Sequence, residues 1–465
     1  MRNLGFLGCQ DYDKSPTSFG KISTYDLGIA YKSARFAPYA KLRFICMDGI
    51  AQSDRDDLDQ RVGDLANHFL SSGFRFFLVG GVVRDLFLGK RSDDIDITTN
   101  ASPEDSDKVL QTWADVVWRQ GERFGTIGAR KGDVTVEVTT HRSEHYVDSS
   151  RKPQVLFSES VLDDLKRRDF TINAMAIEMP TWDLVDPFDG RGDLVRRVLR
   201  TPLGPETAFS EDPLRMLRAA RFVARYSLKT EETLENAIFN MATRIGIVSK
   251  ERISDEMAKF LVVEQPSTGL ALLQRTGLLS EIIPSLKQTG KIESEALDRT
   301  TSEIHLRWAA LLWPLTQDAR QVRQLFRELR MSKALSARVG AIIDAGRELS
   351  LIRNKEAPTL RRAMHLTHPH MDSALALLSA HQQMLDPQIL KALRKLEKEE
   401  GSGNFELPLD GYQVTQLIGE EGPLVGSMLQ RLLETRIERG PLSDCLLYTS
   451  PSPRDYAASR MPSSA

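Results

Sequence analysis

Residues 76–99 constrain the fold more than any other part of this sequence, because they combine an apolar strand, a glycine pair and two closely spaced aspartates: FFLVGGVVRDLFLGKRSDDIDITT. Side chains alternate across a strand, so Asp94 and Asp96 share one face while Ile95 and Ile97 face a core. Two carboxylates this close repel each other, and a hard divalent ion such as Mg²⁺ is the usual way to stabilise them. The pattern predicts a strand that carries a metal site.

The glycine pair Gly80-Gly81 ends the apolar strand that precedes these aspartates. Glycine lets a backbone approach phosphates closely, because it has no side chain and tolerates unusual dihedral angles. The glycine pair and the carboxylate pair together predict a metal-dependent nucleotide site.

A second alternating run, VTVEVTT at 134–140, predicts another strand of the same sheet. Its valines are expected to face the core, and Glu137 the same side as Asp94 and Asp96. Glu137 is therefore a candidate third catalytic carboxylate. The alternative is an ordinary solvated glutamate on a strand.

The segment 209–225, FSEDPLRMLRAARFVAR, has the pattern of a helix start, with Ser210 as its N-cap and Pro213 in its first turn. Arginines recur along one arc of about 120°. They are Arg215, Arg218, Arg221 and Arg225. Because like charges on one helix face repel, we expect either an anionic ligand, such as a triphosphate or RNA, or salt bridges to a neighbouring part of the protein.

Two further sites combine acidic and basic groups. Asp212 and Arg215 are three residues apart on this helix, and a carboxylate beside a guanidinium can pair with the edge of a base. In the apolar segment 164–177, the sequence Arg167-Arg168-Asp169 could form a buried structural pair or contact phosphate and ribose. In the segment 250–261, Arg252 and Glu256 are spaced to pair with each other.

Composition excludes some classes of protein. The chain has 465 residues, of which 41% are hydrophobic and 27% charged, and it contains no apolar run of 18 residues, so we expect no membrane span. Its three cysteines are far apart, which fits a reducing cytoplasm. A net charge of −2 gives no overall bias toward nucleic acid, so any RNA-binding surface must come from local clusters of Lys and Arg.

The order of patterns predicts how the chain is organised. An amphipathic helix is expected at 54–72, strands at 75–80 and 93–98, and almost only helices after about residue 205. The linker KEEGSG at 398–403 precedes a last helical piece.

The motifs between residues 76 and 261 together resemble class II tRNA nucleotidyltransferases, the CCA-adding enzymes, and the related bacterial poly(A) polymerases. GGVVRD with DIDI resembles the metal and triphosphate motif of that family, RRDFTINAMA its ribose-contacting motif, and DPFDGRGDL its hinge motif. EDPLRMLRAARF resembles the nucleotide-selecting motif and KERISDEMAKFL the bracing helix. A weaker similarity to the tRNA-binding tail of the family covers 409–442.

The resemblance implies roles for the matching residues. Asp94 and Asp96 would hold two Mg²⁺ ions, one to activate the 3′-hydroxyl of tRNA and the other to bind the triphosphate of CTP or ATP. Phosphate and nucleotide contacts would come from Gly80, Gly81, Arg84 and Arg168, with Asp169 near the ribose. Asp212 and Arg215 would pair with the base, and Arg218 and Arg221 would support the triphosphate.

The implied fold is α+β: a small mixed-sheet nucleotidyltransferase head of the polymerase-beta type, followed by a long all-helical neck, body and tail. The expected parts are an N-terminal extension (1–47), the head (48–200), the neck (201–268), the body (269–400), the tRNA-binding tail (401–444) and a C-terminal segment (445–465). We expect the two end segments to be foreign to the native protein, the first from a misplaced start before Met47 and the last resembling adapter read-through.

The expected function is addition of CCA to tRNA, without a membrane partner and with the oligomeric state left open. The full-length loop at 141–157 favours complete CCA addition over CC addition. Trp313-Pro314 stands where many relatives carry a His-Asp hydrolase motif, and Pro369 argues against metal binding by His365, His368 and His370. The alternatives are a poly(A) polymerase, a CC- or A-adding enzyme, an inactive RNA-binding relative, or a nucleotidyltransferase for an antibiotic or protein.

Overall fold

The computed structural model describes residues 44–45, 49–121, 125–145, 154–284, 292–419 and 421–442. Most of the expected extension 1–47, the loop residues 146–153 and the segment 445–465 lie outside the described residues. The chain divides into residues 1–42 and 43–465, and the elements below all belong to the second unit. None of its described helices is long and apolar enough to span a bilayer.

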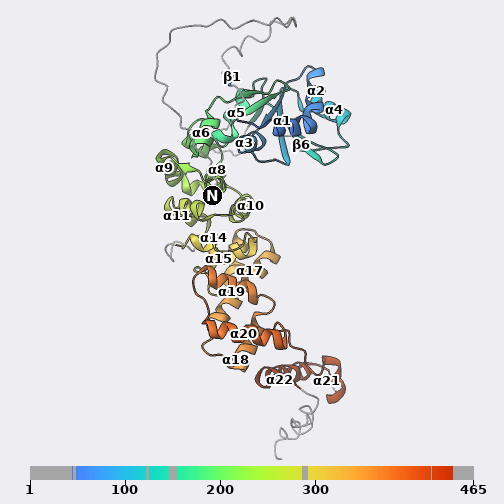
Figure 1. Cartoon of the computed structure of the whole chain (residues 1–465), viewed down its shortest axis with the longest axis vertical. Coiled ribbons are helices and arrows are strands. Elements are labelled where there is room, and N and C mark those ends of the chain that lie inside the picture. Colours follow the sequence, from blue (N-terminus) through green and yellow to red (C-terminus); the bar gives the residue numbers. More distant parts are fainter. Residues whose placement is uncertain are drawn as a thin grey trace, which may run out of the picture. The chain divides into compact units, whose positions relative to one another are not determined.

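A mixed eight-stranded sheet organises the first part of the described chain, in the order β1-β10-β9-β2-β3-β6-β5-β4 (Figure 1). Strands β3 and β6 are parallel, and all other neighbours in this sheet are antiparallel. Its strands are β1 (Phe44–Ile45), β2 (Phe76–Val79), β3 (Asp94–Thr99), β4 (Val116–Gly121), β5 (Thr126–Lys131), β6 (Val134–Thr140), β9 (Ala176–Met179) and β10 (Asp183–Val185). The expected strands correspond to β2, β3 and β6.

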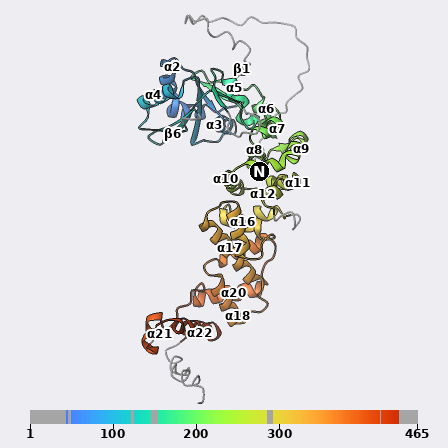
Figure 2. The same cartoon turned by 180° about the vertical axis from the view of Figure 1, so that it is seen from behind.

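Helices cover one face of this sheet. They include α2 and α4, which contact each other and lie side by side in both views, and α4 also packs against β4, β5 and β6 (Figures 1 and 2). Val136 and Val138 are buried on this face, whereas Glu137 is exposed on the other. The helices of this part are α1 (Gln52–Leu58), α2 (Asp64–Ser71), α3 (Gly81–Phe87), α4 (Pro103–Trp113), α5 (Val161–Lys166) and α6 (Gly190–Arg196). A π-helical segment, η2 (Asp59–Gly63), joins α1 to α2, and these three elements form the expected helix.

Short elements lie outside the main sheet and its helices. β7 (Arg142–His145) and β8 (Gln154–Phe157) form an antiparallel hairpin, and β11 (Val198–Leu199) pairs in parallel with β12 (Lys229–Thr230). A 3₁₀ turn, η4 (Thr171–Asn173), follows α5.

The remaining described elements are helical apart from β12, which confirms the expected all-helical second part. They begin with α7 (Pro205–Glu211), α8 (Leu214–Tyr226), α9 (Glu232–Met241), the 3₁₀ segment η5 (Ala242–Ile247), α10 (Lys250–Leu261), α11 (Ser267–Arg275) and α12 (Leu278–Ile282). They continue with α14 (Glu295–Asp298), α15 (Ile304–Leu312), α16 (Ala319–Glu328), α17 (Lys333–Ser350), α18 (Ala357–Thr367), α19 (Met371–Ala380), α20 (Pro387–Glu400), α21 (Gly411–Ile418) and α22 (Pro423–Arg439).

The start of α8 differs from the sequence prediction. Ser210 lies inside α7 and donates its hydroxyl to the carbonyl of Thr207, so it is not the N-cap of the arginine helix. Asp212 is extended and ends α7, because the residue before a proline disfavours helical dihedral angles. Its Oδ1 accepts the backbone N–H of Leu214, the first residue of α8, at 3.1 Å, and Pro213 is the N-cap of this helix.

Buried ion pairs attach α22 to the helices before it. Glu400 of α20 accepts hydrogen bonds from Arg361 of α18 (2.9 Å) and Arg436 of α22 (2.6 Å). All three side chains are at most 10% exposed, and Arg436 also lies 4.5 Å from the ring centre of Phe405. These three charged side chains therefore hold α18, α20 and α22 together.

Candidate active site

The carboxylate pair lies on the face of β3 that is turned away from α4. Asp94 is exposed and Asp96 partly buried, while Ile95 and Ile97 are buried on the other side, as the alternation predicts. Glu137 of β6 is exposed and stands directly opposite Asp96 in the register of the two parallel strands. Burial, together with the charges of Glu137 and Asp94, raises the pKa of Asp96 in spite of the opposing charges of Arg168 and Arg84.

This arrangement suits a cation held jointly by protein and substrate. In the described part of the chain, no three His, Cys, Asp or Glu side chains are arranged to hold a metal ion. Mg²⁺, however, is commonly bound by one or two carboxylates and completed by substrate phosphates. Asp94 and Asp96 supply such a pair of hard oxygen ligands, so their chemistry fits this ion.

The glycine pair forms the turn between β2 and α3, next to Asp96. Gly80 has φ +71° and ψ −123°, a conformation that L-residues rarely adopt. A Cβ placed on Gly80 would lie 2.7 Å from Nη1 of Arg168 and 3.6 Å from Oδ2 of Asp96. Arg168 therefore crosses close to the Gly80 backbone beside the carboxylates.

Arg84 is placed differently from its expected role at a phosphate. It is 6% exposed, and its guanidinium donates to Asp85 (3.0 Å) and Asn173 (2.6 Å). Its guanidinium carbon lies 4.5 Å from the ring centre of Tyr226. In this structure Arg84 joins α3 to η4 and α8.

Asp164 orients both arginines of the Arg167-Arg168 pair, a role that the sequence analysis missed. It is fully buried and accepts hydrogen bonds from Arg167 at 2.6 and 3.0 Å and from Arg168 at 2.9 and 3.2 Å. Burial alone would raise the pKa of Asp164, but the two guanidinium charges outweigh it and lower the pKa to about 2. Its spacing of three and four residues from the arginines was a usable signal.

Asp169 connects the catalytic head to α8. It pairs with Arg218, whose Nε donates at 2.9 Å and Nη2 at 2.5 Å, and it also accepts from Asn173 at 3.0 Å. Burial opposes ionisation of Asp169, yet the charge of Arg218 and the hydrogen bond from Asn173 lower its pKa to about 2. The sequence suggested a buried Arg–Asp pair within residues 167–169, but both arginines pair with Asp164 and Asp169 pairs with Arg218.

The other arginines of α8 are also neutralised by protein carboxylates. Arg221 donates to the buried Glu256 of α10, and Arg215 pairs with Glu211 at 2.9 Å. The predicted Arg252–Glu256 pair is therefore wrong, since Glu256 faces Arg221 and Arg252 instead donates to Asp212 at 2.6 Å. Of the two explanations for the arginine face, salt bridges to neighbouring segments account for Arg215, Arg218 and Arg221 in this structure.

The side chains of Asp212 and Arg215 have different partners. Arg215 is 8% exposed and also donates to the carbonyls of Ala208 (3.4 Å) and Arg167 (2.5 Å). The second carboxylate oxygen of Asp212 is occupied by Arg252, and its side chain is 24% exposed. The backbone N–H of Arg215 donates to the carbonyl of Asp212 at 3.0 Å, while the two side chains are oriented by other residues.

The loop at 141–157 starts from a buried histidine. His141 shares a hydrogen bond of 2.8 Å with Thr98, two residues beyond Asp96 on β3, and its backbone bonds to Thr99 and Ser158. Burial lowers the pKa of His141 to about 4, so the imidazole is neutral near pH 7. The hairpin β7–β8 therefore begins from a fixed point beside the carboxylate strand.

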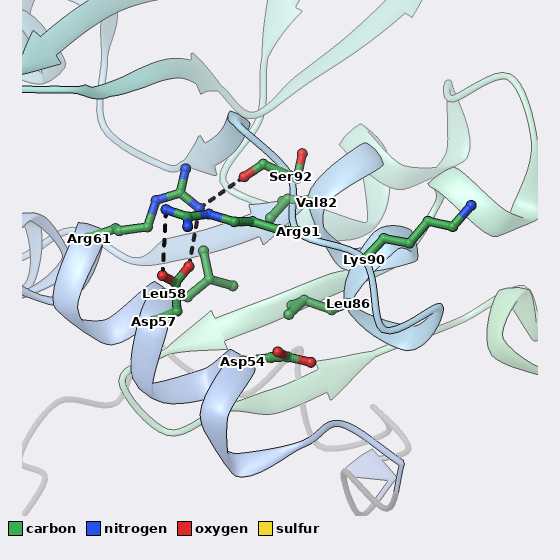
Figure 3. Close-up of a pocket in the computed structure, with 9 residues that line it drawn as sticks. All are labelled: Asp54, Asp57, Leu58, Arg61, Val82, Leu86, Lys90, Arg91 and Ser92. Atoms are coloured by element: carbon green, nitrogen blue, oxygen red, sulfur yellow. Dashed lines mark hydrogen bonds and ion pairs between the residues drawn. The ribbon is translucent and has the colours of Figure 1, made fainter.

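A pocket of about 190 Å³ lies next to this site but contains none of the expected site residues. It is formed by α1, η2, α3 and the loop before β3 (Figure 3). Arg61 and Arg91 converge on Asp57 there, and Arg61 also donates to the carbonyl of Ser92 at 2.9 Å. These pairs brace the loop that leads into Asp94.

The histidines of the helical part have structural neighbours. Nδ1 of His365 donates to the carbonyl of Gly403 (3.2 Å), and Nδ1 of His368 to that of Ser402 (3.3 Å). Trp313 is buried, and the guanidinium carbon of Arg347 lies 3.7 Å from its ring centre. The position that lacks a His-Asp pair is thus part of the core between α15 and α17.

Comparisons with known proteins agree with this geometry. Residues 76–200 match the family described as Poly A polymerase head domain, and residues 227–289 match the probable RNA and SrmB-binding site of polymerase A. The CCA-adding enzyme of Lactobacillus delbrueckii subsp. bulgaricus is 32% identical over 368 residues, which cover 78% of this chain and 89% of that protein. The CCA-adding enzyme of Lactobacillus gasseri is 30% identical over 373 residues, 79% of this chain and 90% of that protein.

Solved structures give the same result. The CCA-adding enzyme of Bacillus stearothermophilus, determined in complex with CTP, superposes with a TM-score of 0.67 at 29% identity and covers 82% of this chain and 93% of its own. The resemblance inferred from the motifs is thereby confirmed, and the chain belongs to the family of CCA-adding enzymes.

Proposed function

We propose that this protein is a cytoplasmic enzyme that adds CCA to the 3′ end of tRNA, using CTP and ATP and releasing pyrophosphate. The observation that carries the proposal is the carboxylate pair of β3, with Arg168 and the Gly80 turn on one side and Glu137 on the other. The chain belongs to the family of CCA-adding enzymes, and this membership supports the same reaction at these residues.

The family typically uses a divalent metal, and we assign Mg²⁺ to Asp94 and Asp96. The ion would lower the pKa of the attacking 3′-hydroxyl and neutralise charge on the triphosphate. Glu137 is the candidate third carboxylate, because it faces Asp96 across the strand pair.

The triphosphate would lie on the Gly80 side of the carboxylates. Gly81 is partly exposed, so its backbone allows close approach, while Gly80 is buried close to Arg168. Arg168, fixed by Asp164, brings a positive charge beside this turn. Arg84 would act from beneath by holding α3 against η4, through Asn173.

Base selection is assigned to Asp212 and Arg215 at the start of α8. A carboxylate and a guanidinium have opposite hydrogen-bonding capacity, which can distinguish the edges of cytosine and adenine from those of other bases. Their separate anchors, Arg252 and Glu211, support a template of fixed geometry. Arg218 and Arg221 would maintain that geometry, with Asp169 near the ribose.

The helical neck, body and tail, within the expected boundaries 201–268, 269–400 and 401–444, would bind the tRNA. Exposed arginines along α16, such as Arg320 and Arg323, are suited to phosphate contacts. A poly(A) polymerase is the second candidate, because both matching family descriptions name that enzyme.

The test is to incubate the protein with tRNA that lacks its CCA end, supply CTP, ATP or both, and sequence the product ends. We expect CC with CTP alone and CCA with both nucleotides, without further extension. Long A tails made without CTP would favour the poly(A) polymerase, and products that end in CC when both nucleotides are present would favour a CC-adding enzyme. Failure to extend any tRNA would contradict the proposal.

A further inference from the structure

Two rows of side chains cross the face of the sheet away from α4 and end at the carboxylate pair. The register places Asp96, Glu137, Gly128 and Trp118 opposite one another on β3, β6, β5 and β4. The neighbouring row contains Asp94, Thr135, Arg130 and Val116. Residues directly opposite each other on neighbouring strands share a face, so both rows lie on the side away from α4.

The indole of Trp118 lies on this face above a glycine. A Cβ on Gly128 would overlap the indole atoms Nε1 and Cε2, so the ring occupies the space that a side chain at this position would fill. Gly128 is buried as a result, while Trp118 itself is partly exposed. The glycine thus lets an aromatic ring lie across the sheet toward Glu137 and Asp96.

Arg130 brings a free positive charge to the same surface. It is exposed, and it forms no ion pair or side-chain hydrogen bond with any residue that the structure describes. By contrast, Arg119 on the opposite face is paired with Asp107 of α4 at 2.6 Å. An aromatic ring with a neighbouring unpaired arginine is the combination that binds single-stranded nucleic acid, through base stacking and phosphate contact.

The direction of the reaction assigns this surface to one substrate. Gly80 and Arg168 lie on the β2 side of the carboxylates, whereas Trp118 and Arg130 lie on the β4 side. In phosphoryl transfer the attacking oxygen and the leaving group are roughly in line, on opposite sides of the phosphorus. If the triphosphate lies on the β2 side, the strand that supplies the 3′-hydroxyl must approach from the β4 side.

We propose that Trp118 is a stacking platform for the 3′-terminal bases of the acceptor strand and that Arg130 contacts its backbone phosphate. Strands are spaced by about 4.8 Å, so the ring above Gly128 is about 10 Å from the backbone at Asp96. That distance lets the last nucleotides of a single strand reach from the carboxylates to the ring. This inference rests on the proposed function, because it assigns the acceptor RNA to that same site.

The first test separates the two substrates kinetically. Trp118→Ala should raise the KM for tRNA lacking CCA about 5- to 100-fold, the range of stacking on one base, and change the KM for CTP less than twofold. Trp118→Phe, which keeps a ring, should restore most of the affinity. The matched control is Trp182→Ala, at the β9–β10 turn, which should leave both KM values near those of the wild type.

The second test detects stacking directly. A tRNA with 2-aminopurine at its 3′ end should lose fluorescence on binding to the wild type and to Trp118→Phe, but much less on binding to Trp118→Ala. Arg130→Gln should raise the KM for tRNA and lower the salt slope of binding by about one. Thermal unfolding identifies a variant that fails to fold, and in that case the fluorescence of the wild-type complex and the salt slope of Arg130→Gln still decide the question.

Opposite results overturn the platform. An unchanged KM for tRNA in folded Trp118→Ala would mean that the ring only covers Gly128, and a selective rise in the KM for CTP would assign it to the incoming nucleotide. A normal salt slope for Arg130→Gln would remove the phosphate contact. These failures would leave a wild type that still makes CCA ends, whereas failure of the proposed function would appear as a wild type that extends no tRNA.

Discussion

Replacing Gly80 by alanine should lower both the stability of the fold and the rate of catalysis, because of the single Cβ atom that it adds. Gly80 has φ +71° and ψ −123°, and an L-residue in such a conformation is strained by about 1–3 kcal/mol. The added Cβ would also lie 2.7 Å from Nη1 of Arg168, so the guanidinium must move.

Arg168 has a long, flexible side chain, but moving it would break its hydrogen bonds to Asp164. Asp164 holds its Nε at 3.2 Å and its Nη2 at 2.9 Å, and a hydrogen bond between charged groups contributes about 1.5–3 kcal/mol. Strain and one lost bond together predict a destabilisation of about 2.5–6 kcal/mol. If Arg168 stabilises the triphosphate, its displacement should also lower kcat/KM for CTP about 10²- to 10³-fold.

Gly81→Ala is the matched control for the fold. Its Cβ would lie at an ordinary 3.5 Å from Nη2 of Arg84, and its φ is outside the left-handed region. Urea unfolding should therefore separate the two variants, with Gly81→Ala near the wild type, and single-turnover CTP incorporation should show the loss of rate in Gly80→Ala. Equal stability of the two variants would refute the argument from the position of Arg168.

Three other outcomes are expected. Asp164→Asn should be about 2 kcal/mol less stable than the wild type at pH 7, because a pKa lowered from 3.8 to about 2 stabilises the fold above pH 4. The difference in the free energy of unfolding should shrink as pH falls from 4 toward 2. If urea unfolding gave the same difference at pH 7 and pH 3, the lowered pKa of Asp164 would not be its cause. Shortening the loop at 142–153 should yield tRNA ending in CC, as sequencing of the ends would show, while continued A addition would refute a role in the switch to ATP. Glu400→Ala should leave Arg361 and Arg436 buried without a carboxylate, which should destabilise the protein by about 3–5 kcal/mol. The variant should therefore bind tRNA more weakly but CTP normally. Unchanged tRNA affinity would mean that α22 does not need this ion pair.

The strands and the carboxylate face could be predicted because a period of two leaves little freedom. Once Ile95 and Ile97 are assigned to a core, Asp94 and Asp96 must share the other face. The same logic placed Glu137 correctly on β6. The helical second part followed equally well from its periodicity, without any knowledge of which helices touch.

The charge partners could not be predicted, because they come from segments far apart in the chain. Arg218 pairs with Asp169 across 49 residues and Arg221 with Glu256 across 35, so helix spacing alone suggested the wrong pair for Glu256. The start of α8 was misplaced for a local reason, since Asp212 before Pro213 was a stronger break than Ser210. The position of Trp118 above Gly128 depends on strand register, which no local pattern contains.

We expect the two carboxylates of β3 to catalyse nucleotide transfer to tRNA. The most direct measurement is single-turnover addition of cytidylate to tRNA lacking CCA, with Mg²⁺ titrated, for the wild type, Asp94→Ala and Asp96→Ala. We expect a Mg²⁺-dependent rate for the wild type and a loss of several orders of magnitude in either folded variant. Near-normal incorporation by either variant would contradict it.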